Sequence, residues 1–94
     1  MSLGPYMVVI APSARRVLLN ALPPKVISAC LAFINGPLRL NPYRVGKPLE
    51  GELAGFHAAR RASFRIRYLI NDMSRRITII DIASRGDAYH RNRA

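Results

Sequence analysis

Acidic residues are scarce in this chain of 94 residues. It has 5 aspartates and glutamates against 15 lysines and arginines, which gives a formal net charge of +10 at pH 7. No acid precedes Glu50, so the positive charge is spread along the chain and is not confined to one terminus. A chain this basic is expected to have a polyanionic partner. The two histidines, one cysteine and five scattered acids do not suggest a metal site, and no pattern calls for a cofactor.

Long apolar runs and cysteine pairs are also missing. No stretch approaches the roughly 20 apolar residues of a membrane-spanning helix, and the N-terminus lacks the basic and apolar regions of a secretion signal. The lone Cys30 cannot form an intramolecular disulfide, and its apolar neighbours indicate a buried thiol. We expect a cytoplasmic protein that makes no use of the membrane. Its length fits one small domain over residues 6–94, with residues 1–5 as an N-terminal extension.

The first half of the chain reads as one strand and two helices. A β-branched apolar run at residues 6–12 predicts the strand, and Ser13 is a candidate N-cap for a helix over residues 14–21. The dipeptide Pro23-Pro24 separates this helix from a second one, which Asn35-Gly36-Pro37 should end. The pattern therefore predicts two antiparallel helices joined by a tight turn.

The second half changes to the period of a β-sheet. Residues 37–53 contain five glycines and prolines with basic residues among them, which predicts an irregular loop from which Arg44 and Lys47 could reach a partner. Three strands follow over residues 56–61, 64–70 and 76–83, joined as antiparallel hairpins. The order β-α-α-β-β-β predicts an α+β fold, in which a helical hairpin packs on one face of a small antiparallel sheet.

A two-residue turn at Ala62-Ser63 would decide which side chains share a face of this sheet. It places Arg60 opposite Arg65, on the open face with Arg67. Like charges directly opposite each other cost stability. Either these arginines are an ordinary solvated surface, or an anion binds between them. The near absence of acids on this face favours the anion.

The opposite face of the same strands is the expected core side. It should carry Phe64, Ile66, Tyr68 and Ile70, joined by Ile80 and Ile82 of the last strand. The one carboxylate of that strand belongs to Asp81, which then faces the arginines and is the expected partner of Arg67. His57 falls opposite Tyr68 on the core side. We therefore interpret it as a packed histidine and keep it in reserve as a catalyst.

Three segments cover most of the sequence: LPPKVISACLAFINGPL, NPYRVGKPLEGELAGFHAARRASFRIRYLI and IIDIASRGDAYHR. They resemble the RelE toxins of bacterial toxin-antitoxin pairs, within the RelE/ParE superfamily. The resemblance extends from about Tyr6 to Arg91. It implies the fold just described and cleavage of messenger RNA in the ribosomal A site, without metal, by attack of the 2′-hydroxyl on the adjacent phosphate.

The resemblance also implies roles for individual residues. Arg65 matches the phosphate-binding arginine of the family, Arg85 the arginine after the last strand, and Tyr89 the tyrosine that orients or activates the attacking hydroxyl. Arg60 matches a basic residue of the preceding strand, and we add Arg67, Lys47 and Arg44 as further substrate contacts.

The sequence departs from the best-known members, whose strand lysines are replaced by Phe56 and Ala58. This departure leaves three outcomes open: slow cleavage, help from Lys47, His57 or ribosomal RNA, and loss of cleavage. The general base is not identified. Expected partners are an acidic antitoxin, the ribosome with its mRNA, and operator DNA when toxin and antitoxin are bound together. The alternatives are a ParE-like inhibitor of DNA gyrase and a non-catalytic basic module that binds nucleic acid.

Overall fold

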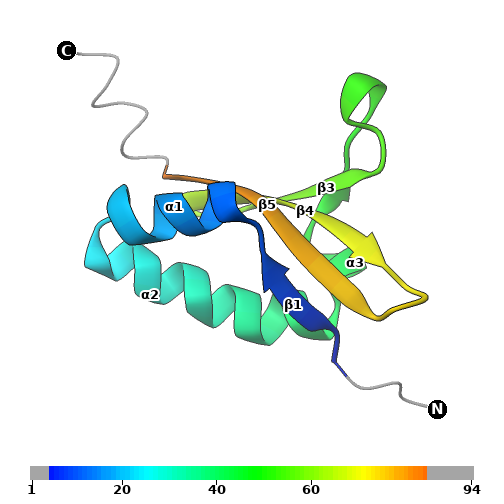
Figure 1. Ribbon diagram of the computed structural model, residues 1–94, viewed down its shortest axis with the longest axis horizontal. Helices are drawn as coiled ribbons and strands as arrows, with labels where there is room; N and C mark the ends of the chain where they lie inside the picture. The colour runs from blue at the N-terminus through cyan, green and yellow to red at the C-terminus, as the bar shows by residue number, and fades with distance from the viewer. Residues whose placement is uncertain (1–4, 85–94) are drawn as a thin grey trace.

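A single five-stranded sheet organises the molecule, for which the computed structural model describes residues 5–84. The strand order is β1-β5-β4-β3-β2 (Figure 1). The strands are β1 (Met7–Ile10), β2 (Lys47–Pro48), β3 (Phe56–Arg60), β4 (Phe64–Asn71) and β5 (Arg76–Ser84). The predicted α+β class is confirmed. One pair differs from an all-antiparallel sheet, because β1 runs parallel to β5 along the far edge.

Helices α1 (Pro12–Asn20) and α2 (Pro24–Phe33) form the predicted helical hairpin. Each begins with proline, whose fixed φ suits the first helical turn. The predicted N-cap role of Ser13 is wrong: Ala11 is the N-cap residue, and the Ser13 hydroxyl instead donates a hydrogen bond to the Ile80 carbonyl of β5 at 2.7 Å. Over residues 5–84, no helix is long and apolar enough to span a membrane.

The second helix does not end at Asn35-Gly36-Pro37 as the sequence predicts. The α-helix ends at Phe33, but residues Ile34–Leu38 continue as a π-helical turn that contains Pro37. Proline has no N–H to donate and clashes with the carbonyl four residues earlier, so a wider turn accommodates it where a regular α-helix does not. The turn brings Ile34 and Leu38 into the core, where both are almost fully buried.

The segment between the helices and β3 has more regular structure than the predicted loop. Helix α3 (Pro42–Val45) and the short β2 come first, followed by a 3₁₀ turn over Gly51–Leu53. Between β2 and β3 the chain stands away from the sheet, at the upper right of Figure 1. The two residues of β2 pair with His57 and Ala58 of β3. The end of β3 that carries Arg60 extends past β2 and forms an edge of the sheet.

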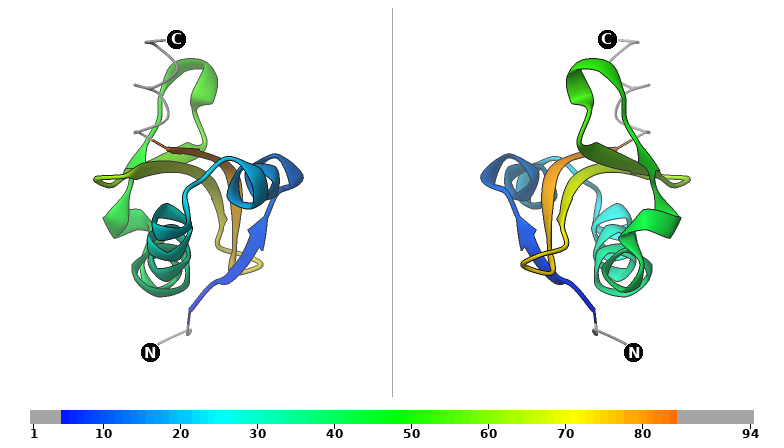
Figure 2. Two further views of the ribbon diagram at one scale, coloured as in Figure 1. Left: turned by 90° about the vertical axis from the view of Figure 1, so that its left-hand side faces the viewer. Right: turned by 90° about the vertical axis from the view of Figure 1, so that its right-hand side faces the viewer.

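One face of the sheet packs against the helices, and the sheet bends over α2 (Figure 2). The buried cluster joins Ala14, Leu18 and Leu22 of the first helical segment to Cys30, Phe33, Ile34 and Leu38, and to Phe64, Ile66, Tyr68, Ile77, Ile79 and Ile82 of the sheet. The predicted burial of Cys30 is confirmed, and burial raises the pKa of its thiol to about 11. These apolar contacts supply most of the favourable free energy of folding.

A β-bulge in β5 changes which isoleucines reach the core. Arg67 lies opposite Asp81 but the next residue, Tyr68, lies opposite Ile79, so Ile80 is the extra residue. The prediction that Ile80 joins the core is wrong, because it assumed unbroken alternation along the strand: Ile79 is fully buried and Ile80 is half-buried. The carbonyl of Ile80 is the one that accepts the Ser13 hydroxyl, so the bulge is tied to α1.

The turn between β4 and β5 is fastened by a carboxylate. The hydroxyl of Tyr6 donates to one Asp72 oxygen at 2.6 Å, and the hydroxyl of Tyr43 donates to the other. These two bonds hold the pKa of Asp72 below its usual value, the bond from Tyr43 contributing most. The same carboxylate raises the pKa of Tyr43 to about 12. The turn thereby fixes both β1 and α3.

Candidate anion-binding groove

The two opposed arginines lie where the sequence predicts. Arg60 of β3 pairs directly with Arg65 of β4, so their side chains leave the same face of the sheet. Both side chains are exposed, and within residues 5–84 neither makes an ion pair or a side-chain hydrogen bond. Two guanidinium groups in this arrangement repel each other, and an anion between them would remove that repulsion.

A groove of about 620 Å³ opens over this arginine pair. Its lining contains six cationic side chains, namely Arg44, Lys47, Arg60, Arg61, Arg65 and Arg67, and no acidic one. The hairpin of β3 and β4 supplies one side, while α3 and β2 bring Arg44 and Lys47 to the other. The prediction that these two basic residues reach the site from the loop is consistent with this placement.

Some groove residues were missed by the sequence reasoning. Val45, Leu49 and Leu53 also line it, and Leu53 is exposed, so the groove combines charge with apolar surface. Arg61 belongs to the core face by alternation, yet it too lines the groove at the hairpin end, with its guanidinium 4.2 Å from the centre of the Phe33 ring. The glycine and proline content of the loop gave no signal for these apolar contacts.

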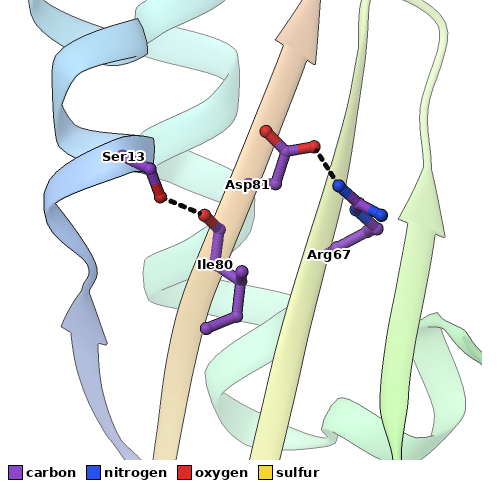
Figure 3. A network of polar contacts seen from close by, with 4 residues as sticks. All are labelled: Ser13, Arg67, Ile80 and Asp81. Atoms are coloured by element: carbon purple, nitrogen blue, oxygen red, sulfur yellow. Dashed lines mark hydrogen bonds and ion pairs between the residues drawn. The ribbon is translucent and has the colours of Figure 1, made fainter. Parts of the chain in front are cut away.

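A direct ion pair joins Arg67 to Asp81, as the sequence predicts. Nη2 of Arg67 lies 2.9 Å from Oδ2 of Asp81, and about a third of each side chain is exposed. Figure 3 shows the two side chains meeting between β4 and β5. Asp81 does not line the groove, whereas Arg67 does. The carboxylate therefore lies beside the arginine, on the β5 side and outside the groove lining.

Lys47 and Arg67 flank the small residue Ala58 across three neighbouring strands. Lys47 pairs with Ala58 across β2 and β3, and Ala58 pairs with Arg67 across β3 and β4. Side chains of directly paired residues share a face, so the three form one row across the sheet. Lys47 therefore lies on the groove face, beside the small side chain of Ala58.

Gly46 fixes the height of this basic segment above the sheet. A Cβ atom at Gly46 would lie 2.1 Å from the Tyr68 hydroxyl and 2.8 Å from the Ala58 carbonyl oxygen. The same hydroxyl donates to the Pro42 carbonyl at 2.6 Å in a buried position. Only glycine permits this close approach, which explains why the RVGKPL motif needs it here.

The reserve catalyst His57 lies on the other side of the sheet from the arginine pair, as the alternation predicts. Its ring stacks on Tyr68 at a centroid distance of 5.7 Å and meets the edge of Tyr43 at 5.5 Å. Burial lowers the pKa of His57, so the neutral imidazole is favoured. Its Nδ1 is buried with no hydrogen-bond partner in the part of the chain that the structure describes.

Comparison with known proteins places this chain in a family. No family model matches the sequence. Toxin RelE of Mycobacterium tuberculosis is 47% identical over 88 residues, which cover 94% of this chain and 90% of that protein. Toxin RelG of the same organism is 42% identical over 87 residues, covering 93% of this chain and 99% of that protein. The chain belongs to the RelE family of toxins.

Solved structures agree with the assignment to RelE. The toxin-antitoxin complex RelBE2 from M. tuberculosis contains a chain with 41% sequence identity and a TM-score of 0.84, and the match covers 87% of this chain and 100% of that one. An archaeal RelE from Pyrococcus horikoshii, in complex with RelB, has 24% identity and a TM-score of 0.68 over 88% of this chain and 98% of its own. The second likeness supports the RelE fold alone. Two predicted catalytic residues, Arg85 and Tyr89, lie outside the described residues 5–84.

Proposed function

We propose that this RelE-family toxin is an endoribonuclease that cuts messenger RNA bound in the ribosome and thereby stops translation. The observation that supports this most directly is the pair Arg60 and Arg65, directly opposed in a groove lined by cations and by no acid. A single-stranded RNA phosphate matches this site in charge and in geometry.

The proposed reaction needs stabilisation of negative charge above all. The 2′-hydroxyl attacks the adjacent phosphorus, the O2′–P bond forms and the P–O5′ bond breaks, giving a 2′,3′-cyclic phosphate and a 5′-hydroxyl. The intermediate carries an additional negative charge on its oxygens. Arg60 and Arg65, which leave the same face of two paired strands, would stabilise that charge from both strands.

Proton transfer requires further groups, because arginine stays protonated near neutral pH and is therefore a poor base. Lys47 is the candidate within the described residues: it lies on the groove face beside Ala58, where better-known family members have a lysine. Its ammonium could protonate the leaving 5′ oxygen. His57 is less suited, because it packs between Tyr43 and Tyr68 away from the arginine pair.

Arg85 and Tyr89 complete the proposed site by resemblance to the family. Tyr89 would orient or activate the 2′-hydroxyl, and nearby cations would help it do so by favouring the phenolate. Arg85 would add a further contact to the phosphate or to the leaving oxygen.

We also propose that an acidic antitoxin neutralises the toxin by covering the same groove, and that the pair binds operator DNA together. The RelBE2 structure is a toxin-antitoxin complex, and the archaeal structure is a complex of RelE with RelB. The net charge of +10 suits such a partner.

The deciding experiment adds purified protein to ribosomes programmed with a defined message and maps new mRNA ends by primer extension. We expect cuts at the A-site codon with wild type, and loss of cutting by at least about 100-fold in Arg65→Ala, Arg85→Ala and Tyr89→Phe. Arg15→Ala, an exposed arginine of α1 outside the groove, is the matched control and should cut normally. Intact message together with blocked supercoiling by DNA gyrase would replace this proposal with the ParE-like function.

A further inference from the structure

The ion pair between Arg67 and Asp81 divides the groove cations into two kinds. Arg60 and Arg65 form one cross-strand row with no acid to neutralise either, whereas the next row contains Arg67 and its carboxylate partner. The first row therefore presents two uncompensated charges to the groove. The second adds only that of Lys47, since Arg67 and Asp81 cancel each other.

We infer that Asp81 withholds Arg67 from the RNA, so that Arg60, Arg65 and Lys47 make the phosphate contacts while Arg67 is a positioning residue. The inference rests on the proposed function, because it names which cations contact the substrate. It revises the sequence-based assignment of Arg67 as a substrate contact.

The position of the guanidinium supports this division. Arg67 points its Nη2 at the Asp81 carboxylate of the neighbouring strand β5. Its Nε is buried with no hydrogen-bond partner among the described residues, so that nitrogen is closed to a phosphate in the groove. Two of the three guanidinium nitrogens of Arg67 are thus bonded to Asp81 or buried, which limits the contact that this side chain can make with a phosphate.

Electrostatics also disfavours transfer of Arg67 from Asp81 to a phosphate. A partly exposed ion pair contributes only about 0–1 kcal/mol to stability, so the bond itself is a weak restraint. Breaking it, however, would leave the Asp81 carboxylate without its cation beside an incoming anion. The repulsion between carboxylate and phosphate would offset the new contact.

The β-bulge is the feature that puts Asp81 in place. Ile77, Ile79 and Ile82 all face the core, while Asp81 faces Arg67 on the opposite side of the sheet. Strict alternation along β5 cannot give this arrangement, and the extra residue Ile80 makes it possible. The hydrogen bond from Ser13 to the Ile80 carbonyl joins the bulge to α1 at the point where the ladder is interrupted (Figure 3). The fold thus fixes both the position and the direction of the Asp81 carboxylate.

The salt dependence of RNA binding tests this inference, because its slope counts phosphate contacts at about 0.7 per contact for single strands. The probe is a fluorescein-labelled 2′-O-methyl oligouridylate, which lacks the attacking hydroxyl, followed by anisotropy between low and high salt. The slope is that of the logarithm of affinity against the logarithm of salt concentration, taken as a magnitude. We expect Arg65→Gln to reduce this magnitude by about 0.7 and Arg67→Gln to leave it unchanged. Asp81→Asn should raise the slope by about 0.7, and the double variant Arg67→Gln/Asp81→Asn should return it to the wild-type value.

Controls and outcomes are matched to these variants. Glu52→Gln removes one exposed acid outside the groove lining and should not change the slope, and urea unfolding verifies that every variant folds. A slope lowered equally by Arg67→Gln and Arg65→Gln would overturn the inference, as would an unchanged slope in Asp81→Asn or no salt-dependent binding at all. Failure of the proposed function would look different: the wild type would leave ribosome-bound message intact while this pattern of slopes persisted.

Discussion

Substitution of Gly46 by alanine tests how the basic segment is held above the sheet. The new Cβ would overlap the Tyr68 hydroxyl at 2.1 Å and the Ala58 carbonyl oxygen at 2.8 Å. Neither can move easily, because Tyr68 is fully buried and Ala58 belongs to β3. The segment carrying Arg44 and Lys47 must therefore shift, and the hydrogen bond from Tyr68 to Pro42 must break.

The expected cost follows from these two effects. Forcing extra volume into a packed site costs about 1–3 kcal/mol, and leaving a buried polar group unsatisfied costs a further 1–3 kcal/mol or so. The smaller entropy of unfolded alanine recovers about 0.4–1 kcal/mol. We therefore expect Gly46→Ala to lower the free energy of unfolding by about 3 kcal/mol, a large share of the roughly 5–15 kcal/mol typical of small proteins.

Urea unfolding followed by circular dichroism measures this cost. Gly36→Ala is the matched control, because a Cβ there meets no atom within 4 Å, and we expect a change of less than about 1 kcal/mol. Tyr68→Phe removes the nearer of the two obstructing atoms, so Gly46→Ala should cost less in that background than in the wild type. Equal midpoints for Gly46→Ala and Gly36→Ala, or fully additive costs with Tyr68→Phe, would refute the reasoning.

Three further outcomes follow from charge. Because the pKa of Asp72 is lowered in the folded state, its carboxylate stabilises the protein above about pH 4, and this contribution is lost as the pH falls below that value. Thermal unfolding across pH measures the stability difference between wild type and Asp72→Asn, which should shrink on acidification. A difference that grows would contradict this. At the alkaline end, the Tyr43 pKa of about 12 means that the hydroxyl of Tyr43 stabilises the folded protein fully below about pH 10, and that this stabilisation is lost as the pH rises through 12. Tyr43→Phe should abolish this pH dependence of stability. For the opposed arginines, Arg60→Thr should stabilise the RNA-free protein by about 0.5 kcal/mol at low salt, less at high salt, while weakening RNA binding. Destabilisation of the RNA-free protein by Arg60→Thr would argue against repulsion between Arg60 and Arg65.

The alternation of the β3 and β4 sequences was enough to predict one face of the site. A two-residue turn fixes the register of β3 and β4, so the pairing of Arg60 with Arg65 follows from the amino-acid sequence. Alternation along the last strand gave only the face of Asp81, on which Arg67 is its partner. The bulge could not be predicted, because four of the five residues at 77–81 are apolar or β-branched and either isoleucine, Ile79 or Ile80, would satisfy the pattern. Tertiary packing against α1 decides between them.

The groove was harder to predict because its second side comes from irregular backbone. Arg44 and Lys47 are obvious as charges, yet nothing in their spacing says how far they lie from Arg65. That distance is set by Tyr68, whose hydroxyl bonds to the Pro42 carbonyl, and by Gly46, which packs against the same hydroxyl. Both contacts join distant parts of the chain, and sequence periodicity carries no information about them.

Tyr68 therefore connects the core to the groove. Its ring is fully buried on the helix side of the sheet, where it stacks with His57, and burial raises its pKa to about 12. Its hydroxyl holds the α3 segment, which ends one residue before the β2 strand that carries Lys47. A core substitution that moves this ring should thus displace cations on the opposite face, and RNA affinity should fall with no groove residue changed. The charge of the groove can be read from composition, but its geometry depends on one buried phenol.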